Sequence, residues 1–227
     1  MKRRACLLLL LSLPLAGCVS GPGQFAKTDI DRIADLHRRE ADASLRRLAG
    51  KLYRRNPREW KKGGHASLEA ALARYNDPVR AVVIDAEGRR GAALVLAGLG
   101  EAYPHDRVAA FVGGLAGMLH DAFDGKAEFF VIDELDPQKL YNAARNLEIA
   151  AWKLAEARRT QPEGDLPAGS PLLFANEMAP VRNLSFEREF GRMIGSLDVL
   201  AQIVADRSQR AVVKVVQNLA TAVFLPI

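Results

Sequence analysis

The sequence predicts a mainly α-helical protein, a single-domain helical bundle-like array with room for one short strand pair. Apolar residues recur at spacings of three and four over long stretches, as at Leu140, Ala144 and Leu147, which is the period of an amphipathic helix. Two Asp-Pro pairs, Asp77-Pro78 and Asp136-Pro137, match a helix cap followed by proline at the first helical position. Hydrophobic residues make up 49% of the chain, enough for a packed core.

The first helix is expected to open at Thr28 or Asp29 and to end before Pro57. Its apolar positions recur at helical spacing through Ile30, Ile33, Leu45, Leu48 and Leu52. A short helix is expected over residues 67–75. Residues 79–85 contain a Val-Val-Ile run that fits a short strand, but the preceding Asp-Pro pair favours a helix.

Residues 91–102 and 108–123 predict a helical hairpin rich in small residues, joined by a turn over residues 103–106. Gly113 and Gly117 have the spacing that lets two helices approach closely, notably in membranes. Membrane insertion and a protein interface are therefore alternatives to a buried core. Each apolar arm is shorter than the roughly 20 residues that span a bilayer, which favours the core.

In the second half of the chain, residues 126–134 suggest a strand or an extended buried connection around Phe129 and Phe130. A helix is expected from Asp136-Pro137 to Arg158-Arg159, followed by a loop over 160–171. Ser185 is expected to cap a helix that continues to Val204. A last helix is expected over 212–224, although its valines also have strand propensity.

The first eighteen residues are typical of an export signal. Three basic residues follow Met1, an apolar run covers residues 6–13, and Leu15-Ala16-Gly17 precedes Cys18. The apolar run is too short to span a bilayer as a helix. In these residues the chain resembles the bacterial lipoproteins, whose lipobox is similar to Leu15-Ala16-Gly17-Cys18.

The resemblance implies cleavage between Gly17 and Cys18 and lipidation of the Cys18 thiol, usually completed by three acyl chains that anchor the protein in the membrane. It divides the chain into a signal peptide (1–17), a lipidated N-terminus with a flexible tether (18–27) and a helical envelope domain (28–227). Val19 stands where similar lipoproteins of the inner membrane often have Asp. For a Gram-negative host this implies the periplasmic face of the outer membrane.

Cysteine and charge limit the chemistry of the mature domain. Cys6 leaves with the signal and Cys18 is lipidated, so no disulfide, cysteine nucleophile or cysteine metal site is expected. Removal of Lys2, Arg3 and Arg4 lowers the formal net charge from +5 to +2. That modest charge and an exported location argue against nucleic-acid binding.

Residues 46–62 form a basic stretch with a single acid, Glu59. Basic residues near an anchor favour contact with anionic lipid or a cell-wall polymer, and an aromatic ring with a polar tip suits such an interface. A solvated helix end is the alternative. The predicted contact residues are Arg46, Arg47, Lys51, Tyr53, Arg54, Arg55, Arg58, Trp60, Lys61 and Lys62.

Catalytic and metal motifs are weak in this chain. Asp133 and Glu134 follow the apolar run around Phe129, and carboxylates at the end of a buried segment are a common way to present a catalytic acid. Asp136 is expected to cap the next helix instead. The one candidate metal cluster is His105, Asp106, His120, Asp121 and Asp124. His105 and His120 would stand at opposite ends of a helix of 15 residues, about 22 Å long, which argues against a shared site. We expect no cofactor, no metal and no catalytic residue.

The preferred functional hypothesis is a non-enzymatic adaptor or accessory subunit, anchored through Cys18 and offering helical surfaces to a protein partner in the envelope. One alternative is a hydrolase or lyase of a cell-wall polymer that uses Asp133, Glu134 or another carboxylate in a cleft. A second alternative is a membrane-perturbing or translocation component that uses the glycine-rich hairpin.

Overall fold

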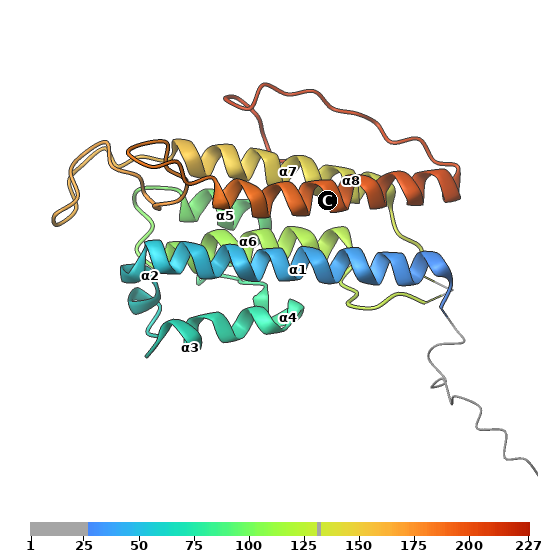
Figure 1. Cartoon of the computed structure of the whole chain (residues 1–227), viewed down its shortest axis with the longest axis horizontal. Helices are drawn as coiled ribbons and strands as arrows, with labels where there is room; N and C mark the ends of the chain where they lie inside the picture. Colours follow the sequence, from blue (N-terminus) through green and yellow to red (C-terminus); the bar gives the residue numbers. More distant parts are fainter. Residues whose placement is uncertain (1–26, 131–132) are drawn as a thin grey trace, which may run out of the picture.

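The computed structural model describes residues 27–130 and 133–227, so Cys18 and all of the predicted tether except Lys27 lie outside the described residues. The described residues form an array of α-helices, so the mainly α prediction is confirmed (Figure 1). Among the described residues, β pairing is limited to three isolated bridges, and no sheet forms. The short strand pair that the sequence allowed is therefore absent from this part of the chain. The elements are α1 (Asp29–Arg55), α2 (Pro57–Lys62), α3 (Leu68–Leu72), the 3₁₀ helix η1 (Ala73–Asn76), α4 (Pro78–Ala81), α5 (Gly91–Gly98), α6 (Arg107–Ala122), α7 (Pro137–Glu156) and α8 (Ser185–Ser208).

Helix α6 lies at the centre of the array, and every residue from Arg107 to Leu119 is buried. The long helices α1, α7 and α8 run side by side along the molecule, with α8 in contact with both α1 and α7 (Figure 1). Phe111 of α6 meets Phe190 of α8 edge to face, with ring centroids 6.4 Å apart. The apolar seams expected from the sequence therefore share one core.

The glycine-rich hairpin is part of this core. A Cβ atom at Gly114 would lie 2.7 Å from the Gly91 carbonyl oxygen, so glycine is what allows α5 and α6 to pack so closely. This confirms the core interpretation of the hairpin. Within the described residues, no helix is long and apolar enough to cross a membrane.

The helix starts predicted from side-chain caps are confirmed at three places. Thr28 and Asp31 form a capping box at the start of α1. Asp77 and Asp136 accept hydrogen bonds from the first-turn N–H groups of α4 and α7. These caps satisfy N–H groups that would otherwise have no partner.

Two predictions about helix ends need correction. Ser185 is the first residue of α8 rather than its cap, and its N–H donates to the Asn183 side chain at 3.1 Å. Helix α4 ends at Ala81, so residues 82–85 of the helix predicted over 79–85 are not helical. Val83 lies in this non-helical part and packs against Gly113 of α6.

The predicted helix over 212–224 is wrong, because this segment is extended and then turns back (Figure 1). Its β-branched residues lose side-chain freedom in a helix, and α7 supplies alternative hydrogen-bond partners. The amide of Gln138 donates to and accepts from the backbone of Val213. Asn146 does the same for Leu225, with N···O distances of 2.9 and 2.7 Å.

Candidate functional site: the distal basic end

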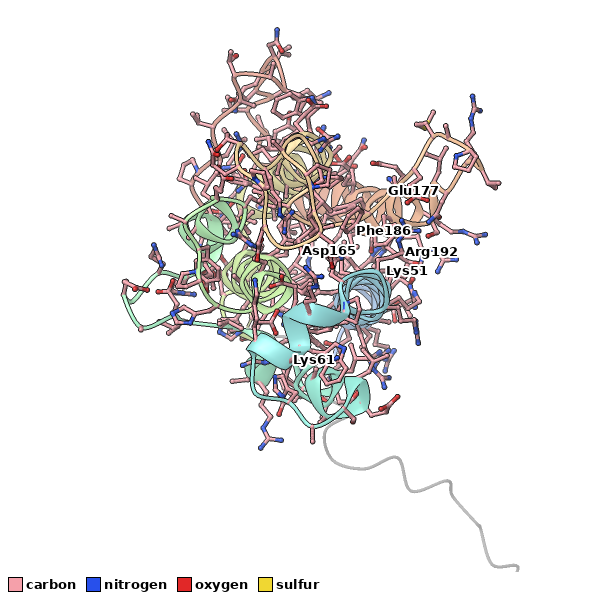
Figure 2. The ribbon with its side chains drawn as sticks, turned by 90° about the vertical axis from the view of Figure 1, so that its left-hand side faces the viewer. Lys51, Lys61, Asp165, Glu177, Phe186 and Arg192 are labelled. Carbon is pink, nitrogen blue, oxygen red and sulfur yellow. The ribbon has the colours of Figure 1, made fainter. Side chains whose placement is uncertain are left out.

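The predicted basic stretch lies at the end of α1 opposite Thr28 (Figure 1). At 1.5 Å per residue, Arg46 is about 27 Å and Arg55 about 40 Å along the helix from Thr28. We call this the distal end; it consists of the last turns of α1, helix α2, residues 157–184 and the first turns of α8. Figure 2 looks at this end, with Lys61 on α2 and Lys51 on α1.

Two of the predicted contact residues are held by one buried acid. Glu189 of α8 is 3% exposed and accepts hydrogen bonds from Arg47 at 2.8 Å and from Lys51 at 2.6 Å. Burial alone would raise the pKa of the Glu189 carboxyl, but the hydrogen bonds from Lys51 and Arg47 outweigh burial and lower it. Arg47 and Lys51 therefore join α1 to α8.

Three more cations of the stretch also have acidic partners. Arg55 pairs with Glu177, and Arg58 lies 3.5 Å from Asp165. Lys62 lies 3.5 Å from both Glu59 and Glu163. The stretch itself contains one acid, Glu59, and folding adds Glu163, Asp165 and Glu177 from far away in the chain.

Of the two aromatic residues of the stretch, Tyr53 is buried in the core and Trp60 packs partly buried against it. Tyr53 is fully buried, and its hydroxyl donates to Asp106 at 2.8 Å, so its assignment to a surface contact is wrong. Burial raises the pKa of both the Tyr53 hydroxyl and the Asp106 carboxyl. Trp60 is partly buried against the core, with the Lys61 ammonium 5.5 Å from its ring centroid.

Six exposed cations at the distal end make neither an ion pair nor a side-chain hydrogen bond among the described residues, whereas Arg158 donates to the carbonyls of Ala155 and Ala157. Three of them, Arg46, Arg54 and Lys61, were in the predicted set. The other three come from later in the chain, and sequence reasoning missed them because only the antiparallel packing of α8 on α1 brings them here. The six open cations are Arg46, Arg54, Lys61, Arg182, Arg188 and Arg192.

A cleft of about 330 Å³ at the other end of α1 brings together the acids of the hydrolase hypothesis. Asp31, Asp133 and Glu134 line it, beside Phe129 and Leu135. Asp31 serves the capping box of α1. The Lys126 ammonium and the Phe130 N–H lower the pKa of Asp133, and the Glu134 side chain is 85% exposed, 3.8 Å from Arg210.

A general acid needs a raised pKa near neutrality, and the contacts of Asp133 act in the opposite direction. Asp136 is engaged as the cap of α7. Among the described residues, no group of three or more His, Cys, Asp or Glu side chains is arranged to hold a metal ion. Asp121 and Asp124 pair instead with Arg90 and Lys139.

Comparison with known proteins adds no relative to this picture. No family model matches the chain, and neither a curated protein nor a solved structure matches it.

Proposed function

We propose that the protein is a non-enzymatic adaptor or accessory subunit, anchored by lipidated Cys18 at the periplasmic face of the outer membrane. Its distal end binds an anionic component of the envelope. The observation that carries the proposal is the set of open cations, which remain exposed after the other cations of the stretch have found acidic partners. These cations form no ion pair within the described residues, so ion pairing inside the domain does not explain them.

The position of these cations supports contact with something beyond the anchor. Arg46 and Arg54 lie about 27 and 39 Å along α1 from Thr28, where the tether would begin. An anchored domain standing on the membrane would present them to another envelope component. Lying flat, the same domain would place them on anionic lipid head groups. In both orientations the cations bind anionic groups, and the experiment below distinguishes lipid from another envelope component.

The test uses the domain without residues 1–18, so that acyl chains do not dominate binding. The triple variant Arg46→Ala, Arg54→Ala, Lys61→Ala is compared with a control that removes three exposed cations outside the distal end, Arg39→Ala, Arg80→Ala, Lys214→Ala. Binding is measured to vesicles containing phosphatidylglycerol and to soluble cell-wall fragments.

Each basic residue near an anionic surface contributes on the order of 1 kcal/mol. We therefore expect the distal triple variant to weaken binding at least tenfold, and the control much less. Loss on vesicles would identify lipid as the anionic component, and loss on fragments alone would identify the polymer. Equal binding by wild type and both variants would contradict the proposal.

The hydrolase alternative keeps one specific observation, the cleft that gathers Asp31, Asp133 and Glu134. It predicts cleavage of cell-wall fragments by the wild type, and loss of cleavage in Asp133→Asn and Glu134→Gln variants that remain folded. No cleavage by the wild type would rule against this alternative.

A further inference from the structure

The outward face of α8 has no helix packed on it among the described residues. Helix α8 buries Phe190, Met193 and Leu197 against the core. Its opposite side carries exposed residues that recur at three and four and therefore lie in one row. These residues are Arg188, Arg192, Gly195, Val199, Gln202 and Asp206.

The middle of this face is apolar and has a glycine next to a projecting valine. A Cβ atom added at Gly195 would meet open space, because no atom outside its own stretch of helix lies within 4 Å. One turn further along, the Val199 side chain is 52% exposed. Leu36 of α1 is 59% exposed and lies nearby, because the adjacent His37 contacts Ser196 at 2.7 Å. Two large apolar side chains, Leu36 and Val199, thus remain exposed to water beside Gly195.

The two ends of the face carry opposite charges. Arg188 and Asp206 are both exposed, and neither has an ion-pair partner among the described residues. They are 18 residues apart, which is five helical turns, so they lie on the same side of α8 about 27 Å from each other. They are too distant to pair within one molecule.

We propose that this face binds a second copy of the chain, α8 against α8, antiparallel about a two-fold axis level with Leu197. Residue 197 is midway between Arg188 and Asp206, and also midway between Gly195 and Val199. A single axis at this level therefore places Arg188 opposite Asp206 of the second copy. It also places Val199 over Gly195 of the second copy, where the missing side chain leaves space, and every contact occurs twice.

Self-complementarity of this kind is what an isologous two-fold interface requires. A different helical partner would have no reason to match both midpoints. One helix face is small compared with the interfaces of stable dimers, so the association in dilute solution is weak. A shared membrane anchor raises the effective concentration. The inference shares Arg188 with the open cations of the distal end, but it does not depend on the proposed adaptor function, because it uses none of Arg46, Arg54 and Lys61.

Exchanging the charges of Arg188 and Asp206 tests the proposed dimer by loss and recovery of the ion pairs. Sedimentation velocity of the full-length lipidated protein in mild detergent measures the dimer dissociation constant. The variants Arg188→Asp and Asp206→Arg each create two like-charged pairs, and each should raise the constant at least tenfold. The double variant restores opposite charges with the positions exchanged, and should return within about threefold of wild type.

Glu187→Arg is the control, because residue 187 lies toward α7 and outside this face, and its constant should stay within about twofold of wild type. Circular dichroism verifies that each variant is folded. The proposal is overturned if the wild type is monomeric at 100 µM protein, or if the double variant is no better than the single variants. Asp206→Arg leaves every open cation of the distal end in place, so a loss of the dimer in this variant without weaker binding to anionic vesicles would keep this result separate from the proposed function.

Discussion

Glu189→Gln is expected to destabilise the protein by about 1–3 kcal/mol at neutral pH, because it removes the one negative charge that holds Arg47 and Lys51 against α8. The Glu189 side chain is 4% exposed, and its two oxygens accept from Arg47 at 2.8 Å and from Lys51 at 2.6 Å. A hydrogen bond to a charged group typically contributes about 1.5–3 kcal/mol. The exposed fractions of Arg47 and Lys51, 38% and 24%, bring the total toward the lower part of that range through solvent screening.

The pH dependence gives this prediction a second, independent readout. The pKa of Glu189 in the folded protein lies below its ordinary value of 4.5. Its contribution to stability is therefore present above about pH 4.5 and is lost as the pH falls through the folded-state pKa. The difference between wild type and variant should be largest near pH 7 and should disappear in the acid range.

Urea unfolding at a series of pH values measures the free energy of unfolding of both proteins. Glu187→Gln is the matched control on the same helix. Its side chain is exposed and accepts only from Asn176, so its effect should stay within about 0.5 kcal/mol. A Glu189→Gln effect no larger than the control, or one independent of pH, would refute the assigned role of Glu189.

Two further predictions test the packing of the array. Asn146→Ala removes both hydrogen bonds to Leu225 and should cost about 1–3 kcal/mol, with faster proteolysis within residues 211–223; an unchanged cleavage rate would show that Asn146 does not hold this segment. Gly114→Ala places a Cβ atom 2.7 Å from the Gly91 carbonyl oxygen and should cost about 1–3 kcal/mol by overpacking. Gly191→Ala meets nothing within 4 Å and should stabilise α8 by up to about 1 kcal/mol. Thermal unfolding distinguishes the two glycines, and equal shifts would contradict the hairpin packing.

Local signals were sufficient for most of the helices. The capping side chains of Thr28, Asp77 and Asp136 act within three residues of their own position, so their effect can be predicted without knowing the fold. The apolar period of α7 and α8 likewise identifies the buried face of each. The lipobox assignment rests on residues 15–18, which the structure does not describe, and it stays a prediction.

The errors came from interactions between segments distant in the sequence. Residues 212–224 have a helical apolar period, but Gln138 of α7 exchanges hydrogen bonds with the backbone of Val213, and Asn146 of α7 does so with Leu225, just after this segment. Tyr53 looks like an interfacial residue in the basic stretch, yet Asp106 meets its hydroxyl in the core. The charge of the stretch was overestimated for the same reason, because Glu189 and Glu177 neutralise it from elsewhere.

The most direct test of the central claim is site-specific cross-linking in cells, with a photoreactive residue at position 54 of the distal end and, separately, at position 80 of α4. We expect one dominant adduct from position 54, much less of it from position 80, and its loss in Cys18→Ala. Adducts of equal yield from both positions, or an adduct at position 54 that survives Cys18→Ala unchanged, would contradict an anchored adaptor that works through its distal basic end.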